Sequence, residues 1–462
     1  MTASALTTGI VLLHLLGVFA AMHAVMHART PQGAIGWALG LMLLPYATLL
    51  PYLYLGSSRF LGYRIAHPAA PPRTLPLPAE APADPGSERY AAISALQGRA
   101  FRSGHRLRLL IDGDAAFEAM LAAMATAEHC LLVQFFIIHD DALGQRLQRI
   151  LLDRAAAGVR VCVLFDGIGS HALPQRYVDT LRAGGVAIHR FATHRWRNRL
   201  QLNFRNHRKI VVVDGARAFV GGLNVGDEYL GLKPPLAPWR DTQLELQGPA
   251  VTDLQQLFAQ DWQWITGKQP PLLPAPAVEG QASALIVACG PADPQETGSL
   301  FFTAAINAAR QRVWLSTPYF VPDHAVRAAL QLAVLRGVDV RVLIPSRPDH
   351  RTVFLASSLH AHHAVRAGIR VFRYQPGFLH QKALLIDRDT AAIGSMNLDS
   401  RSFRLNFEVA AMVVDQGFAV EVAAMLVADF SHARAVDERD YRDAPYLNRV
   451  AMQVARLFDP LL

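Results

Sequence analysis

Two long apolar stretches open the chain. Residues 5–26 and 34–55 contain no Lys, Arg, Asp or Glu, and a short polar segment separates them. Each stretch spans about 22 residues, or roughly 33 Å as a helix, which is enough to cross the apolar core of a bilayer. The pattern predicts an N-terminal hairpin of two transmembrane helices over residues 1–60, with the second helix kinked at Pro45 and Pro51.

The residues after the hairpin indicate how it inserts. Arg59, Arg64 and Arg73 follow the second apolar stretch, whereas the turn between the two stretches carries Arg29 alone. Because positive charge favours the cytoplasmic side, we expect a multi-pass protein of the cell's inner membrane with its larger, C-terminal part in the cytoplasm. Residues 61–90 include a Pro- and Ala-rich segment without a period, which predicts a stiff linker between the anchor and the globular part.

Beyond the linker, segments of helical period alternate with short apolar strands, and the sequence repeats itself. Residues 154–166 resemble residues 333–345, since each runs from a helix end through a glycine turn into a Val-rich strand. Such alternation predicts an α/β fold. We expect two repeats, over residues 91–270 and 281–462, each a mixed β-sheet flanked by helices.

The most specific repeated element starts at a histidine. In both copies a Lys follows the histidine after two positions, an Asp after seven, a Gly after fourteen and an Asn after seventeen. The members are His207, Lys209, Asp214 and Asn224 in one copy and His380, Lys382, Asp387 and Asn397 in the other. The aliphatic residues between Lys and Asp predict a buried strand, whose alternation places His and Lys on one face. One copy alone is a weak pattern, but two copies with equal offsets argue for a shared site.

Two histidines, two lysines and two asparagines suit the chemistry of a phosphate group. If the repeats pack face to face in a pseudo-two-fold unit, one imidazole can attack phosphorus while the other protonates the leaving oxygen. The lysines neutralise the charge on the non-bridging oxygens. Because lysine supplies this charge and no Cys/His or carboxylate-rich cluster is evident, we expect no metal and no other cofactor. We group Asp214 and Asp387 with the catalytic residues, as carboxylates that brace the site.

The composition favours an anionic partner. The 462 residues are 52% hydrophobic and carry a formal net charge of +8. These values exclude a disordered chain and are compatible with nucleic acid, a membrane surface or a phosphate-bearing substrate. Cys130, Cys162 and Cys289 are too widely spaced for a disulfide framework or a CxxC metal site, so we expect buried thiols.

The duplicated motif resembles that of the phospholipase D superfamily, and the surrounding residues resemble its bacterial cardiolipin synthases. The resemblance is carried in the first half by residues 203–229 and 238–251, and in the second half by residues 317–323, 344–350, 377–387 and 395–408. It implies that one phosphatidylglycerol gives its phosphatidyl group to a histidine and releases glycerol. A second phosphatidylglycerol then attacks through its glycerol hydroxyl, and the product is cardiolipin.

The resemblance also implies roles for individual residues. In the superfamily an acidic residue downstream of each motif orients the histidine, and Asp241 and Glu408 stand at the corresponding places. A carboxylate that accepts from one ring nitrogen leaves the other nitrogen free to react. The same resemblance makes His207 the nucleophile and His380 the general acid and base, although the symmetry of the two copies leaves this choice open.

Two other functions are compatible with the motif. A hydrolytic phosphodiesterase of the same superfamily would pass the phosphatidyl group to water. An inactive lipid-binding scaffold would be expected to have lost a His or Lys from a motif, and all four are present. Because nucleic acid does not lie in a bilayer, the predicted hairpin argues against a nuclease, and we expect no nucleic-acid partner. The expected partners are phosphatidylglycerol and other anionic membrane lipids. Phosphatidylethanolamine is an alternative second lipid, and the oligomeric state stays open.

The final segment of the chain carries a helical stripe of apolar residues. Within residues 446–458 the stripe consists of Leu447, Val450, Ala451, Val454 and Leu457. We expect this stripe to pack on the core, with contact to a membrane as the alternative.

Overall fold

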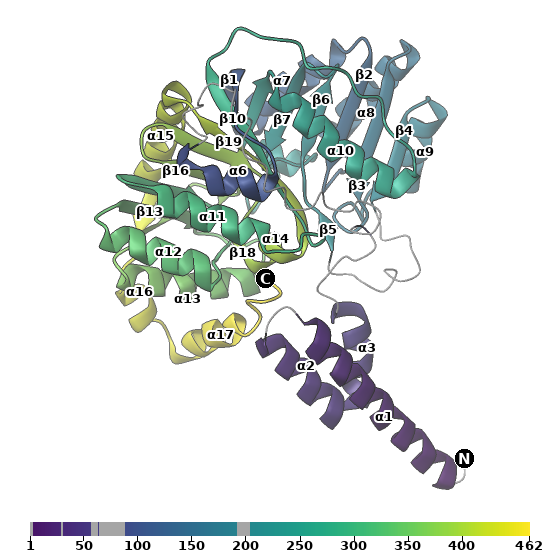
Figure 1. The fold of residues 1–462 in the computed structure, drawn as a ribbon, viewed down its shortest axis with the longest axis vertical. Coiled ribbons are helices and arrows are strands. Elements are labelled where there is room, and N and C mark those ends of the chain that lie inside the picture. The colour runs from purple at the N-terminus through teal and green to yellow at the C-terminus, as the bar shows by residue number, and fades with distance from the viewer. Residues whose placement is uncertain (1–2, 29–30, 57–62, 64–87, 192–203) are drawn as a thin grey trace. The chain divides into compact units, whose positions relative to one another are not determined.

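The computed structural model describes residues 3–28, 31–56, 63, 88–191 and 204–462 (Figure 1). They fall into a smaller part that contains the N-terminal helices and a larger part that contains residues 88–191 and 205–462, and each part is described by itself. The predicted linker lies outside the described residues except at residue 63 and at residues 88–90.

Three helices make up the N-terminal part: α1 (Ala3–His27), α2 (Pro31–Leu43) and α3 (Pro45–Leu55). Among the described residues, α1 alone is long and apolar enough to cross a membrane, through its span Thr7–His27. The second predicted transmembrane helix is not confirmed as one continuous span, because the chain breaks at Leu44, next to the predicted kink at Pro45, and forms two shorter helices.

The break has a local cause. Proline has no backbone N–H, so Pro45 cannot donate to the carbonyl of Leu41 as a continuous helix would require. That carbonyl faces Gly17 of α1, where an added Cβ would lie 2.3 Å from the oxygen. The freed carbonyl and the missing side chain therefore allow α1 and α2 to approach closely.

The larger part is built around a 16-stranded mixed sheet in which one strand order occurs twice. The first half has, in spatial order, β9 (Thr242–Gln247), β7 (Arg217–Gly221), β6 (Ile210–Val213), β2 (Cys130–Phe135), β3 (Arg160–Asp166) and β4 (Ala187–Phe191). The second half has β19 (Asn406–Val414), β17 (Thr390–Gly394), β16 (Ala383–Ile386), β11 (Arg312–Ser316), β13 (Asp339–Pro345) and β14 (Arg370–Tyr374), with β20 (Ala433–Ala435) at the edge. In each half the last three strands of this common order run parallel and the others pair antiparallel, which confirms the predicted repeat.

Two central strands join the halves. β1 (Arg102–Ile111) pairs with β9 of the first half and with β10 (Ala282–Cys289), and β10 pairs with β19 of the second half. The segment before β1 includes α6 (Ala91–Gln97), and its buried Ile93 belongs to the core of the second half although it opens the predicted first repeat.

Helices cover both faces of the sheet (Figure 1). The first half carries α7 (Asp112–Ala125), α8 (Ala142–Ala156), α9 (Gln175–Ala183) and α10 (Ala250–Thr266). The second half carries α11 (Thr297–Ala308), α12 (His324–Leu335), α13 (Arg351–Arg366), α14 (Ser400–Arg404) and α15 (Gln416–Ser431), followed by α16 (Arg439–Arg442) and α17 (Tyr446–Arg456).

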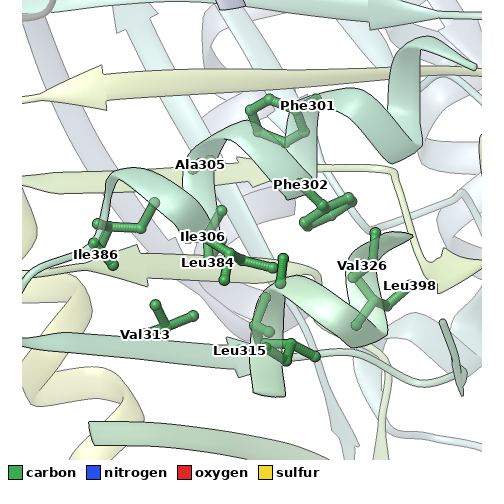
Figure 2. Packing of buried hydrophobic residues seen from close by; sticks show 14 of the residues in the cluster. Phe301, Phe302, Ala305, Ile306, Val313, Leu315, Val326, Leu384, Ile386 and Leu398 are labelled. Atoms are coloured by element: carbon green, nitrogen blue, oxygen red, sulfur yellow. The ribbon is translucent and has the colours of Figure 1, made fainter. Parts of the chain in front are cut away.

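Strand alternation divides the core into layers. Val313 and Leu315 of β11 pack with α11 and α12 in a core that belongs to the second half, as Figure 2 shows. Trp314, on the opposite face of the same strand, packs in another core, which also contains Leu132 and Ile210 of the first half. Because this core takes side chains from both repeats, they fold as one body. All three cysteines are free and buried in the larger part, as expected.

Candidate active site

Backbone pairing between the two halves brings His207 to Glu408. His207 lies in an extended segment between the short strand β5 (Arg205–Asn206) and β6, rather than inside the predicted strand. β5 runs parallel to the start of β19, and the His207 N–H donates to the carbonyl of Phe407 at 2.9 Å. The next residue of β19 is Glu408, whose carboxylate oxygens lie 2.9 and 3.0 Å from His207 Nδ1.

His380 is held by the same arrangement with the halves exchanged. It follows β15 (Phe378–Leu379), which runs parallel to β8 (Trp239–Arg240), and its N–H donates to the carbonyl of Arg240 at 2.8 Å. Its Nδ1 lies 2.7 Å from the Asp241 carboxylate. Each acid therefore contacts the histidine of the other half and not the histidine that precedes it in sequence, which corrects the partners implied by the order of the residues along the chain.

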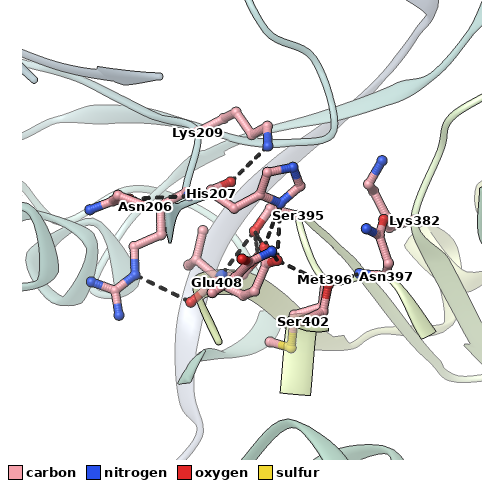
Figure 3. A network of polar contacts seen from close by, with 12 residues as sticks. Asn206, His207, Lys209, Lys382, Ser395, Met396, Asn397, Ser402 and Glu408 are labelled. Atoms are coloured by element: carbon pink, nitrogen blue, oxygen red, sulfur yellow. Dashed lines mark hydrogen bonds and ion pairs between the residues drawn. The ribbon is translucent and has the colours of Figure 1, made fainter. Parts of the chain in front are cut away.

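The lysines of both motifs are buried beside the imidazoles. Lys209 donates from Nζ to the backbone carbonyl of His207 at 2.7 Å, and Lys382 Nζ lies 3.0 Å from both ring nitrogens of His380. Figure 3 shows Lys382 and Asn397 of the second half facing His207 and Lys209 of the first. The four motif side chains and the two carboxylates therefore surround one site.

Burial controls the protonation of both imidazoles. The pKa of His207 is lowered to about 4, mainly by burial, while Glu408 raises the pKa and Lys209 and Lys382 lower it. Burial and Lys382 lower the pKa of His380 to about 4 against the effect of Asp241. Both rings are therefore neutral near pH 7, and an Nδ1–H that donates to the carboxylate leaves a lone pair on Nε2. In His380 this nitrogen lies 3.0 Å from Lys382 Nζ.

The carboxylates and lysines form a charge-balanced set. Burial would raise the pKa of Glu408, but His207 and Lys209 more than offset it, and the pKa is lowered. For Asp241 the same holds with His380 and Lys382. Burial lowers the pKa of Lys382 to about 8, which leaves most of it charged at neutral pH. Burial also lowers the pKa of Lys209 well below its usual value. Two carboxylates and two lysines balance in charge only when both lysines are protonated.

The small residue that follows the motif glycine leaves room for each acid. At Gly222 an added Cβ would lie 2.1 Å from Asp241 Oδ1. Its counterpart Ser395 instead donates to Glu408 at 2.5 Å. Ser402 Oγ and Asn406 Nδ2 also donate to Glu408, at 3.0 and 3.1 Å. The residue after the motif glycine must therefore either lack a side chain, as Gly222 does, or donate a hydrogen bond to the acid, as Ser395 does.

The two asparagines differ in what they can offer a ligand. Asn224 accepts from the Ile137 N–H at 3.1 Å and donates to the Tyr229 hydroxyl at 3.1 Å, so its side chain serves its own half. Asn397 is buried, and its Oδ1 has no hydrogen-bond partner among the described residues. Asn397 therefore presents a side-chain amide to the site next to Lys382.

The motif aspartates do not contact the histidines, which corrects their placement with the catalytic residues. Asp214 and Asp387 lie at the opposite ends of β6 and β16 from His207 and His380, each with a positive φ of 51°. The carboxylate of Asp214 accepts from the backbone N–H groups of Glu128, His129 and Cys130. The carboxylate of Asp387 accepts from those of Arg310, Gln311 and Arg312 and pairs with Arg89. They brace the turns that lead into β2 and β11.

Two aromatic rings line the site, and the motif alone does not predict them. Phe136 meets the His207 ring edge to face with centroids 4.9 Å apart, and the Trp239 ring lies 5.1 Å from that of His380. Trp239 also donates from Nε1 to Asp241 at 3.4 Å. Trp239, Ser402 and Asn406 lie in stretches that carry the family resemblance, but nothing in the sequence assigns them a role, and Phe136 reaches the site only through the fold. Among the described residues, no group of three or more His, Cys, Asp or Glu side chains is arranged to hold a metal ion.

Known proteins are similar in sequence to this chain over nearly its full length. A family model described as "Cardiolipin synthase, PLD-like domain" matches residues 120–262 and 302–433. A Cardiolipin synthase A of Pseudomonas aeruginosa (strain LESB58) is 57% identical over 464 residues, which cover 97% of this chain and 95% of the relative. A Cardiolipin synthase A of Pseudomonas entomophila (strain L48) is 55% identical over 465 residues, which cover 98% and 97%.

The fold also occurs in a solved structure of low sequence identity. The crystal structure of phosphatidylserine synthase from Haemophilus influenzae Rd KW20 aligns with a TM-score of 0.61 and 13% identity over 81% of this chain and 100% of that chain. At this identity the likeness concerns the fold alone. The near full-length matches and the family model, taken with the duplicated motif, show that this chain belongs to the family of cardiolipin synthases with phospholipase D-like domains.

Proposed function

We propose that the two repeats, residues 91–270 and 281–462, form one pseudo-two-fold catalytic unit that makes cardiolipin from two molecules of phosphatidylglycerol. The observation that carries the proposal is the exchanged pairing of His207 with Glu408 and of His380 with Asp241. This pairing orients two neutral imidazoles around the same buried lysines. Family membership supports phosphatidyl transfer as the reaction.

In the first step, Nε2 of His207 attacks the phosphorus of one phosphatidylglycerol. The bond between phosphorus and the glycerol oxygen breaks, and His380 gives that oxygen the proton from its Nε2. In the second step, His380 takes the proton from a glycerol hydroxyl of another phosphatidylglycerol. The resulting oxygen attacks phosphorus, the phosphorus–nitrogen bond breaks, and His207 is restored. The balance is two phosphatidylglycerols to one cardiolipin and one glycerol.

Substrate binding favours the protonation of His380 that the first step needs. A bound phosphodiester adds a negative charge beside both rings. A negative charge raises the pKa of a nearby imidazole, which allows His380 to take up a proton as the substrate binds. Glu408 and Asp241 hold the reactive tautomers, while Lys209, Lys382 and the Asn397 amide stabilise the charge on the non-bridging oxygens.

The location proposed for the enzyme is the inner membrane, with the larger part in the cytoplasm. The apolar helix α1 is long enough to anchor the chain. The cluster of arginines that follows the N-terminal helices supports a cytoplasmic position for the rest, and the two short helices α2 and α3 would return the chain to that side.

The test uses the full chain in vesicles with phosphatidylglycerol labelled in its terminal glycerol. We expect labelled cardiolipin and free labelled glycerol, whereas phosphatidic acid as the sole lipid product would indicate hydrolysis. His207→Ala and His380→Ala should each abolish turnover, while His171→Ala, at an exposed position, should not. Rapid denaturation during turnover should trap a phosphatidyl group on the peptide that contains His207. Trapping on His380 instead would exchange the two roles.

A further inference from the structure

The C-terminal helix α17 is attached to the larger part by one side only. Ala455 is 3% exposed and packs with Val321 and Ala356. Just beyond the helix, the carboxylate of Asp459 lies 2.8 Å from Nε2 of the buried His360. The helix is therefore held firmly on α13 through this side.

The last residues of the chain connect α17 to α14, which follows the second motif. The backbone N–H of Arg401 donates to the carbonyl of Leu462 at 2.7 Å, and the Arg401 side chain donates to the carbonyl of Leu461 at 3.2 Å. Arg401 belongs to α14, which begins three residues after Asn397. The surface of α17 and the chain end therefore belongs to the same region of the fold as the second motif.

The other side of α17 is apolar and exposed in the part of the chain that the structure describes. Leu447 and Leu457 are 77% and 73% exposed. The remaining members of the exposed face are Tyr446, Val450, Val454, Phe458 and Leu461. Within α17, a spacing of three and four residues places Tyr446, Leu447, Val450 and Val454 on one side, and Leu457, Phe458 and Leu461 lie in the turns just beyond the helix. The expectation that the stripe packs on the core is therefore wrong for most of its members, and a contiguous exposed face of this kind marks an interaction surface.

Charge indicates what this face meets. Residues 444–458, which span α17, include Arg449 and Arg456 and no Asp or Glu. An isologous contact between two copies would bring these arginines toward their counterparts, at a cost in repulsion. An anionic bilayer instead satisfies both features, since its acyl region takes the apolar face and its phosphates take the arginines.

We propose that α17 is a second membrane contact, separate from α1, which lies in the headgroup layer of an anionic bilayer with its apolar face inward. Arg449 and Arg456 then lie at the level of the lipid phosphates. Because α17 is held rigidly on α13 and the chain end is bonded to α14, this contact would orient the larger part on the membrane. The active site would thereby meet lipid headgroups without lipid molecules leaving the bilayer.

The cysteine content of the chain makes a direct test possible. The three native cysteines are buried, so a thiol introduced at Leu457 is the accessible one. We would attach an environment-sensitive fluorophore to Leu457→Cys in the full chain, reconstituted in phosphatidylglycerol/phosphatidylethanolamine vesicles that contain a spin-labelled lipid quencher. The matched control is Leu335→Cys, an 82% exposed leucine at the C-terminal end of α12.

The expected result is at least threefold stronger lipid quenching at Leu457→Cys than at Leu335→Cys. Adding Leu447→Gln should lower the equilibrium constant for docking of α17 about tenfold, because one leucine loses its burial in the bilayer. Equal quenching at the two labelled positions would overturn the proposal. Cross-linking of the Leu457→Cys thiol to a second copy or to the N-terminal helices, without lipid quenching, would also overturn it, since protein would then cover the face.

A second measurement separates docking from folding and from catalysis. The double variant Leu447→Gln/Leu457→Gln should raise the KM for phosphatidylglycerol in vesicles at least tenfold, leaving kcat and the activity on detergent-dispersed lipid unchanged. The control Leu332→Gln/Leu335→Gln should change none of these. Loss of activity in detergent as well would indicate misfolding of the variant, and the quenching measurement would then decide alone.

Discussion

Replacing Glu408 by Gln tests the pairing between the halves. Glu408 is fully buried and accepts from His207 Nδ1 at 2.9 Å and from three other donors, Ser395, Ser402 and Asn406. Gln has the same shape, but it is neutral, and its amide nitrogen donates. The His207 proton then loses its hold on Nδ1 and can move to Nε2, which removes the nucleophilic lone pair. We expect kcat to fall roughly 10³- to 10⁴-fold, as in other sites where the orienting carboxylate becomes an amide.

The same change has consequences for protonation and stability. Glu408 raises the pKa of His207, so its loss lowers that pKa further below about 4. The ring stays neutral near pH 7, and the activity lost should therefore not return on changing the pH between about 6 and 8. Leaving donors of the buried network without their charged acceptor should cost about 2 to 3 kcal/mol of the free energy of unfolding.

The assay compares single-turnover release of glycerol and thermal unfolding in the full chain. Glu421→Gln, at an exposed position on α15, serves as the matched control. A double-mutant cycle for the free energy of unfolding should give a coupling of about 1 to 3 kcal/mol between Glu408 and His207, and close to zero between Glu408 and His380. Glu408→Gln with more than a tenth of the original kcat, or coupling to His380 instead of His207, would refute the exchanged pairing.

Three further outcomes are expected. Asp387→Asn should lower the free energy of unfolding by about 2 to 4 kcal/mol, because a charged acceptor of three N–H groups is lost, and kcat should change less than tenfold. A loss of activity without a loss of stability would return Asp387 to the catalytic residues. The unfolding temperature should fall as the pH drops from about 6.5 to about 4, because the histidines bind protons in the unfolded chain while buried His207 and His380 do not. Each ring should lower the free energy of unfolding by roughly 3 kcal/mol. The variant His207→Gln/His380→Gln should show a weaker dependence on pH, and an unchanged dependence would contradict this assignment. The kcat/KM should fall as the pH rises through about 8, where Lys382 loses its proton. Lys382→Arg should move this fall in the pH profile to higher pH, and an unchanged profile in the variant would assign the fall to another group.

Local patterns in the sequence were enough to identify the repeated unit and its chemistry. Apolar runs and helical periods depend on neighbouring residues, so the α/β alternation and the apolar helix α1 could be predicted without tertiary contacts. The equal offsets around His207 and His380 likewise follow from one strand–turn–strand geometry used twice. Asp241 and Glu408 could be named as the orienting acids, because a family resemblance carries residue positions, but it does not carry their partners.

Only the tertiary structure decided which side chains meet. The exchange of acids depends on the pairing of β5 with β19 and of β8 with β15, and these strands are remote in sequence, so no local rule sets their register. The motif aspartates turn away from the site because their strands end at the opposite edge from the histidines. In the same way, the pattern of α17 shows that it is amphipathic, but whether its apolar side faces a core or stays open depends on which elements cover it. Periodicity determines the face of an element, and packing between distant elements determines what that face contacts.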